Sequence, residues 1–191
     1  MAPTGPRPER ADAARNRARI LAAARELFDR HGVDAIPLER VAAHAGVSKA
    51  TLFRRFGDRQ ALFLALLDEH ERTLQDAMLG GPPPLGPGAP PLERLHAFAD
   101  ALLALSLEHR AFLLASETAH PLARLRTGAY AAWHVHVTAL LEQTGAADPP
   151  VLAHLVLAAV DAELLTALAQ DGLAPDRLAA ALHDLLERVR G

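Results

Sequence analysis

Four residues that can bind an anionic polymer lie close together in one short stretch: Lys49, Thr51, Arg54 and Arg55. The stretch from residue 49 to residue 56 predicts a helix, and it contains no acidic side chain. Cationic and hydroxyl side chains on such a helix can contact phosphates and reach the edges of bases. Lys49 is also the only lysine in the chain. The chemistry predicted here is noncovalent recognition of a nucleic acid.

The residues just before this helix predict a tight corner between two helices. Ala42 is small enough for two helices to cross closely, and Gly46 can adopt the positive φ that ends a helix. Val47 fills the corner, and Ser48 suits the N-cap of the second helix. Together with Val41, Leu52 and Phe56, which supply the apolar spacing, the stretch 37–59 predicts a helix-turn-helix.

A second possible chemistry is metal binding. Glu93 and His96, and again Glu117 and His120, have the Glu-x-x-His spacing that helical bundles use in dimetal sites. Further carboxylates could come from Glu108, Glu142 or Glu163. Against this hypothesis, the pairs fall on consecutive predicted helices, and an acid such as Glu93 is favoured at any helix start. The other histidines we considered are expected to be exposed or local, at spacings that make no ligand set: His44, His70, His109 and His183.

Apolar periodicity predicts an all-α protein. Proline and glycine separate most of the predicted helices. Residues 80–91 contain four glycines and six prolines in twelve positions, which excludes helix and strand and predicts a boundary with partial disorder. Besides the two helices of the motif, the helices are predicted at 12–30, 59–78, 92–108, 110–120, 121–144, 149–171 and 175–190.

Composition excludes several classes of protein. The chain has 191 residues and no cysteine, which removes disulfides, thiolate metal sites and cysteine nucleophiles. Residues 1–60 hold twelve Lys/Arg against seven Asp/Glu, a net +5, whereas residues 61–191 hold eight against sixteen, a net −8. A basic part joined to an acidic part favours an anionic partner at one end. No signal peptide, membrane span or catalytic triad spacing is expected.

The stretch from Arg17 to Leu67 resembles the N-terminal domain of the tetracycline-repressor (TetR/AcrR) family of regulators. The resemblance rests on Gly32-Val33, Val41-Ala42, Ala45-Gly46-Val47-Ser48, Thr51-Leu52-Phe53, Phe56, Arg59 and Leu62. It implies a dimeric transcription factor, usually a repressor, that a ligand releases from DNA. The operator contacts it implies are Ser48, Lys49, Ala50, Thr51, Phe53, Arg54, Arg55 and Arg59.

Three positions depart from the pattern of that family. Phe53 replaces the usual tyrosine and loses a hydroxyl contact to phosphate, and Pro37 replaces a capping threonine or serine. Arg59 replaces a lysine and keeps the positive charge. A basic arm at residues 1–10, expected to be disordered when free, includes Arg7 and Arg10. With Arg15, Arg17 and Arg19 it could contact DNA, or it could simply be solvated.

The C-terminal part is expected to hold a small, largely apolar effector among a few polar groups. Tyr130, Trp133 and His134 share one predicted helix face and could stack on a planar ligand, although a core aromatic cluster is the simpler reading. His134 and His136 should point about 200° apart on a helix, which argues against a shared metal ion unless the helix breaks. The candidate ligand-binding residues are His96, Asp100, Glu117, His120, Tyr130, Trp133, His134 and Thr138.

The sequence therefore predicts an all-α, cytoplasmic DNA-binding regulator. It comprises an N-terminal three-helix helix-turn-helix domain and a C-terminal helical ligand-binding and dimerisation domain. Its predicted partners are a double-stranded DNA operator, a small-molecule effector and a second copy joined through residues 151–171 and 175–190, with no cofactor. The alternatives are an effector-less DNA-binding protein and a metal-binding helical-bundle enzyme. The predicted segments are the arm 1–10, the DNA-binding domain 11–58, the connecting helix 59–79, the loop 80–91 and the body 92–191.

Overall fold

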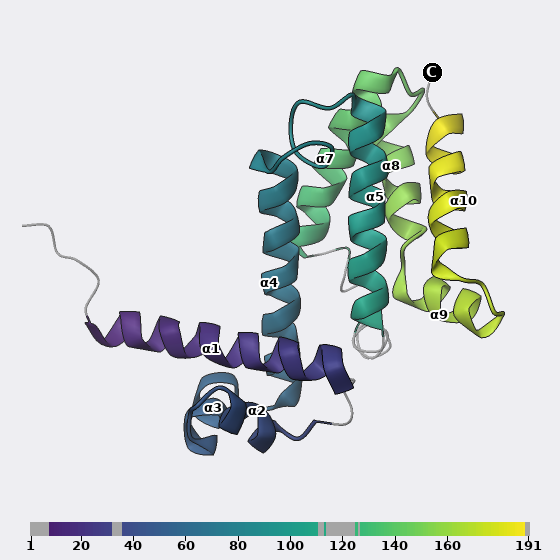
Figure 1. Ribbon diagram of the computed structural model, residues 1–191. Coiled ribbons are helices and arrows are strands. Elements are labelled where there is room, and N and C mark those ends of the chain that lie inside the picture. Colours follow the sequence, from purple (N-terminus) through teal and green to yellow (C-terminus); the bar gives the residue numbers. More distant parts are fainter. Residues whose placement is uncertain (1–7, 32–35, 111–112, 114–124, 126, 190–191) are drawn as a thin grey trace, which may run out of the picture. The chain divides into compact units, whose positions relative to one another are not determined.

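The computed structural model describes residues 8–31, 36–110, 113, 125 and 127–189. Every regular element in this described part is a helix, as the sequence predicts (Figure 1). The chain divides into two compact units, Met1–Glu69 and His70–Gly191. The division falls inside one long helix, α4 (Arg59–Gly80).

The first unit contains a helix-turn-helix. Helix α1 (Pro8–His31) packs against α2 (Leu38–His44), which in turn packs against α3 (Lys49–Phe56). The inner face of α1 is apolar, and its Ile20 and Ala24 are fully buried. Leu52 of α3 and Val41 of α2 are also fully buried. This small core holds α3 in place and leaves its basic side chains exposed.

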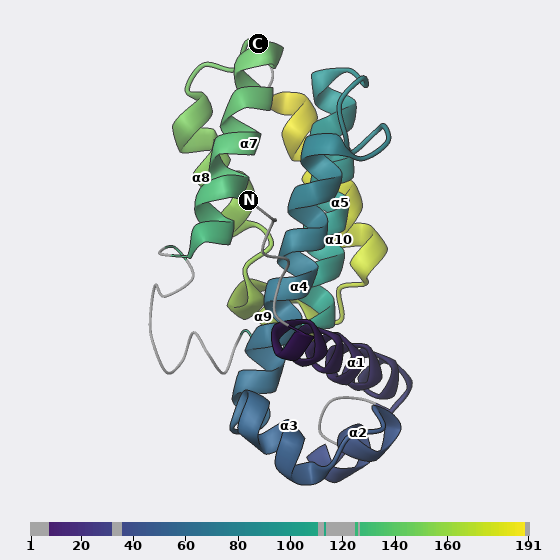
Figure 2. The ribbon, with the colours of Figure 1, turned by 90° about the vertical axis from the view of Figure 1, so that its left-hand side faces the viewer.

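The second unit is built from five further described helices, and Figures 1 and 2 show several of them running side by side. α5 packs on both α7 and α10, and α7 packs on α8. Leu95 and Phe98 of α5 and Val137 of α7 are among the most deeply buried residues. The five helices are α5 (Pro91–Glu108), α7 (Gly128–Thr144), α8 (Pro149–Ala158), α9 (Ala162–Gln170) and α10 (Pro175–Arg188).

Three predicted helix boundaries were wrong. The predicted helix 149–171 is two helices, α8 and α9, because the Asp161 side chain accepts a hydrogen bond from the backbone N–H of Glu163 and starts a new helix. The helix predicted from residue 121 begins at Gly128, where Thr127 caps it. α1 begins at Pro8 instead of residue 12. Most of the predicted helix 110–120 lies outside the described residues.

The Gly/Pro-rich loop is correctly predicted to be neither helix nor strand, although Gly80 and Pro91 at its ends belong to helices. Its path is compact instead of extended. A Cβ atom at Gly86 would lie only 1.9 Å from the carbonyl oxygen of Gly81, so the two backbone segments approach too closely for any other residue. The structure describes turns and bends at residues 81–90, and the partial disorder expected from their composition stays a prediction.

Within the described residues, no single helix is long and apolar enough to cross a membrane. Only α8 and α9 taken together pass such a test, and they are bent by 47° at their junction.

Candidate nucleic-acid interface

The corner of the helix-turn-helix is held by Arg19 and Gly46. Gly46 has a φ of +64°, as predicted for the residue that ends α2. The Arg19 guanidinium of α1 donates to the carbonyl oxygens of Ala45 at 2.6 Å and Gly46 at 3.1 Å. A Cβ atom at position 46 would lie 2.6 Å from the same guanidinium nitrogen. The positive φ therefore favours glycine here, and an added Cβ atom would also displace the flexible end of the Arg19 side chain.

Ser48 caps α3, as its position predicts. Its Oγ accepts a hydrogen bond from the backbone N–H of Thr51 at 3.1 Å. It also lies 2.8 Å from the Thr51 hydroxyl, so the two hydroxyls are hydrogen-bonded to each other. The cap fixes the first turn of α3, from which Lys49 and Ala50 are exposed.

Lys49 has two neighbours within its own unit. Its Nζ lies 2.5 Å from Oε1 of Glu39 on α2, and 5.5 Å from the centre of the Phe53 ring. Phe53 is 37% exposed, so this aromatic side chain lies at the surface. Glu39 places one negative charge at the edge of an otherwise basic surface.

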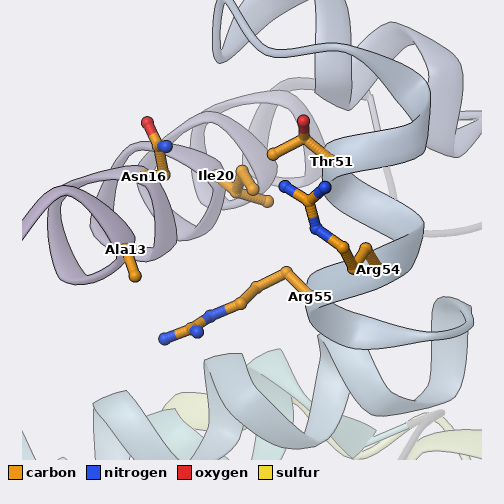
Figure 3. Close-up of a pocket in the computed structure, with 6 residues that line it drawn as sticks. All are labelled: Ala13, Asn16, Ile20, Thr51, Arg54 and Arg55. Atoms are coloured by element: carbon orange, nitrogen blue, oxygen red, sulfur yellow. The ribbon is translucent and has the colours of Figure 1, made fainter. Parts of the chain in front are cut away.

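Arg54, Arg55 and Thr51 of α3 line a pocket whose other wall is α1 (Figure 3). Asn16 of α1 supplies a polar amide on that wall, and the volume is about 170 Å³. Within the described part of the chain, neither Arg54 nor Arg55 has an ion-pair partner. Two cationic side chains, a hydroxyl and an amide around one small pocket form a suitable seat for a phosphate group.

Other predicted contacts in this unit have mixed outcomes. Arg59 lies at the start of α4 with its guanidinium 5.8 Å from the Phe63 ring centre. Pro37 precedes α2 and provides no side-chain cap, as predicted. Arg15 pairs with Asp12, and Arg19 donates to the corner; whether either residue contacts DNA stays a prediction. Arg7 and the Arg10 side chain lie outside the described part.

In the second unit, the predicted ligand residues fall into separate groups. His96 of α5 stacks on His183 of α10 with 4.3 Å between ring centres, and Asp100 accepts a hydrogen bond from His183 at 2.8 Å. Burial lowers the pKa of His96, and the nearby His183 lowers it further. His183 was predicted to be exposed or local, yet it is half-buried and contacts a distant helix.

A second group lies between α7 and α8. The buried Tyr130 hydroxyl is 2.7 Å from Nδ1 of His154. His134 lies 4.0 Å from the His154 ring, centre to centre, and its Nε2 donates to the carbonyl oxygen of Pro150 at 3.0 Å. The aromatic cluster is therefore largely satisfied by its own contacts.

A third group on α7 contains buried polar atoms that have no hydrogen-bond partner among the described residues. They are Trp133 Nε1, His136 Nε2 and Thr138 Oγ1, and Arg94 Nε of α5 is another. His136 also contacts the Phe98 ring, with 5.2 Å between centres, and its pKa is lowered to about 4 by burial and by Arg94. Unpartnered buried polar groups are costly, so each needs a partner. His136 was not among the predicted ligand residues, because its alternation with His134 was read only as an argument against metal.

An apolar pocket of about 200 Å³ lies elsewhere in this unit. None of the predicted ligand residues lines it. Its walls come from α5 and from the C-terminal helices, and the residues are Leu103, Ala159, Leu164, Leu168, Leu178, Ala181, Leu182 and Leu185.

The histidine prediction needs one correction. His70 and His109 were expected to make no ligand set, but with Glu108 they bring three possible metal ligands within 4.8 Å of one another. The two histidines are 39 positions apart, so no local spacing connects them. Glu93 and His96 join no such group within the described residues, and Glu117 and His120 lie outside them.

The first unit of the chain resembles known protein sequences more strongly than the second unit does. Residues 20–66 match the family described as bacterial regulatory proteins, tetR family. An HTH-type transcriptional regulator of Staphylococcus aureus is 43% identical over 64 residues, covering 34% of this chain and 35% of the relative. Another from that species is 27% identical over 128 residues, covering 63% of this chain and 64% of the relative. The chain thus matches between about a third and two thirds of these curated relatives' length.

Solved structures match over more of the chain. A transcriptional regulator from Rhodococcus sp. Rha1 has a TM-score of 0.67 and 25% identity, with coverage of 91% of this chain and 95% of that one. A TetR transcriptional regulator from Streptomyces coelicolor has a TM-score of 0.58 and 28% identity, with coverage of 91% and 98%. The helix-turn-helix, the fold of the second unit and the match of residues 20–66 therefore agree with one another, and together they support a TetR-family transcriptional regulator.

Proposed function

We propose that the protein is a homodimeric, ligand-responsive DNA-binding regulator of transcription. The observation that carries this proposal is the exposed basic face of α3, where Arg54, Arg55 and Thr51 surround a pocket of about 170 Å³. No acidic residue lies on α3, and the carboxylate of Glu39 on α2 is paired with Lys49. Similarity to proteins named as transcriptional regulators supports a regulatory role.

Helix α3 would enter the major groove of a double-stranded operator. Its first turn, with Lys49 and Ala50, would approach base edges, as N-terminal residues of recognition helices do. Ser48, Thr51 and Arg59 would contact phosphates, and Phe53 would pack against the sugar-phosphate backbone. Arg54 and Arg55 would grip phosphate or read guanine, the two partners that suit a guanidinium fork.

A dimer would place two such helices on successive major-groove faces, about 34–36 Å apart. Support comes from the apolar face of the last helices, where Leu164 is 42% exposed and Leu185 is 39% exposed. Leu168 and Leu178 line the same apolar pocket. A second copy of the chain would cover this face, because leucines exposed together favour association.

The effector would be a small, largely apolar molecule held in the second unit. Trp133 and His136 would give it a polar anchor, since their ring nitrogens are buried without a described partner. A coupling of about 1–3 kcal/mol would change operator affinity roughly five- to 150-fold, which is typical of allosteric proteins.

Repression would follow from occupation of the operator, and the site of action would be the cytoplasm. The alternative is a dimeric DNA-binding protein without an effector. In that case no small molecule should raise the melting temperature of the protein.

The test is fluorescence anisotropy of the full chain with the DNA that flanks its own coding sequence, at two salt concentrations. Wild-type protein should bind tightly and more weakly at high salt, because phosphate contacts release counterions. The double variant Lys49→Ala/Arg54→Ala should lose this binding. Arg72→Ala, at an exposed arginine of α4 within the second unit, is the matched control and should bind like wild type.

Weak binding that is equal on flanking and random DNA would count against a local operator, and selection from a random DNA pool would then be applied. Failure to select any sequence would contradict the proposed function. Compounds that release the DNA and raise the melting temperature of the second unit would support the ligand-responsive form.

A further inference from the structure

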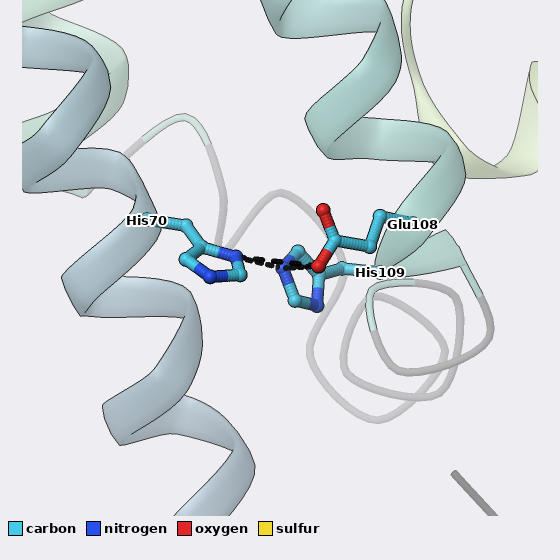
Figure 4. Close-up of side chains that lie close together, drawn as sticks. All are labelled: His70, Glu108 and His109. Atoms are coloured by element: carbon cyan, nitrogen blue, oxygen red, sulfur yellow. Dashed lines mark hydrogen bonds and ion pairs between the residues drawn. The ribbon is translucent and has the colours of Figure 1, made fainter. Parts of the chain in front are cut away.

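Three side chains that the DNA-binding function does not use converge in the second unit (Figure 4). His70 comes from α4, whereas Glu108 and His109 lie at the end of α5. The His70 Nδ1 and His109 Nε2 atoms are 2.6 Å apart. The Glu108 Oε1 atom is 3.6 Å from the first nitrogen and 3.7 Å from the second.

These three distances describe a triangle of the size that a metal ion requires. Three atoms separated by 2.6, 3.6 and 3.7 Å lie on a circle with a radius of about 2.0 Å, which is the length of a Zn–N or Zn–O bond. An ion near the centre of that circle lies at bonding distance from all three atoms, and tetrahedral coordination would require the two nitrogens to move apart to about 3.3 Å. We propose that His70, Glu108 and His109 form a binding site for a divalent transition-metal ion such as Zn²⁺.

The charges of the site favour a cation. The two imidazole nitrogens face each other at 2.6 Å, so one donates its N–H to the lone pair of the other and only one proton fits between them. A metal ion replaces that shared proton and uses both nitrogen lone pairs. The carboxylate of Glu108 supplies a negative charge to the same point.

The two histidines of the site are buried, whereas its carboxylate is partly exposed. The side chains of His70 and His109 are 15% and 10% exposed, so packing restricts their orientations. Glu108 is 46% exposed, so its carboxylate is reached from solvent. Two imidazoles with one carboxylate suit zinc, cobalt or nickel, whereas magnesium and calcium prefer oxygen ligands.

Metal binding would tie α4 to the end of α5 within the second unit. Glu108 and His109 follow His70 by 38 and 39 positions in the sequence. The ion would therefore close a long loop of the chain, which includes residues 81–90. Such a cross-link stabilises the folded unit because the unfolded chain does not preform the site. This inference goes beyond the proposed function and does not depend on it, since DNA takes no part in the binding.

The test is titration calorimetry of the tag-free full chain with Zn²⁺, alongside visible spectroscopy with Co²⁺. We expect one ion per chain, an absorbing Co²⁺ complex and a raised melting temperature. His70→Gln and His109→Gln should abolish binding. Glu108→Gln should weaken it by at least about tenfold, the factor lost even when an outer partner of a metal ligand is removed. Mg²⁺ should give no signal.

Matched control variants show whether the loss of Zn²⁺ binding is specific to the three proposed ligands or follows from removing any histidine or carboxylate. His31→Gln removes an exposed histidine from α1, and Glu142→Gln removes an exposed glutamate near the end of α7. Both should bind Zn²⁺ like wild type. Absence of saturable binding to the wild type, or equal affinity in wild type and Glu108→Gln, would overturn the proposal. Glu108 is exposed, so its variant remains informative even if the histidine variants fold poorly.

Discussion

The Nζ atom of Lys49 and the Oε1 atom of Glu39 lie 2.5 Å apart, joining the start of α3 to α2. The hydrogen bond from Lys49 lowers the pKa of Glu39, so the carboxylate is charged at neutral pH. Both side chains are more than half exposed. When Lys49 contacts a phosphate or a base, it must therefore either leave Glu39 or contact both groups at once.

Glu39→Gln removes the intramolecular competitor of Lys49. We expect this variant to bind DNA about two- to fivefold more tightly at low salt, a size typical of one exposed charge pair. The gain should shrink at high salt because exposed charges are screened. Anisotropy titrations at two salt concentrations measure it, with Glu142→Gln in the other unit as the control. A loss of affinity would mean that the pair positions Lys49 for binding.

Gly46→Ala should destabilise the first unit by about 1–3 kcal/mol, the usual cost of a strained backbone position. The added Cβ atom meets a positive φ and displaces the Arg19 guanidinium from the corner. Urea unfolding monitored by circular dichroism provides the measurement. Gly80→Ala is the control, because its Cβ would meet nothing within 4 Å and its φ is not positive. That variant should be neutral or gain up to about 1 kcal/mol.

His136 should make the protein less stable in mild acid. Its pKa is lowered from 6.5 to about 4 by burial and by Arg94, so folding favours the neutral ring. Between these values the unfolded chain binds the proton and the folded chain does not, so stability falls as pH drops from 6.5 to 4. Above pH 6.5 the group contributes no pH dependence. Melting temperatures of His136→Gln should vary less over this window, and an unchanged pH profile would exclude the effect.

Leu185→Glu should convert the proposed dimer to a monomer. The residue is 39% exposed on α10 and lines the apolar pocket with Leu164 and Leu178. A carboxylate buried there on association would lack a partner, which is unfavourable. Light scattering during size-exclusion chromatography reports the mass. Val135→Glu, at a 68% exposed position on α7, should remain dimeric. A wild-type monomer would refute the proposed interface.

The corner of the helix-turn-helix could be predicted from sequence because its determinants are local. A positive φ at Gly46 and a cap at Ser48 depend on neighbouring residues, and both were confirmed. The pocket between α1 and α3 could not be predicted, since Asn16 and Arg55 meet only through tertiary packing.

The second unit was less predictable for the same reason. His70 and His109 were expected to have local roles, because no sequence periodicity relates two helices separated by a long loop. The break between α8 and α9 was missed because the apolar pattern continues through Val160, which is buried, while the cap depends on the conformation of Asp161.

The most direct test of the central claim compares Arg54→Ala and Arg55→Ala with wild type on operator and on random DNA. An arginine that reads a base should cost about 1–3 kcal/mol on the operator alone, whereas one that grips phosphate should weaken binding equally on both and reduce the salt slope by about one. We expect at least one of the two arginines to show one of these patterns. Unchanged affinity and salt slope in both variants would contradict DNA recognition by α3.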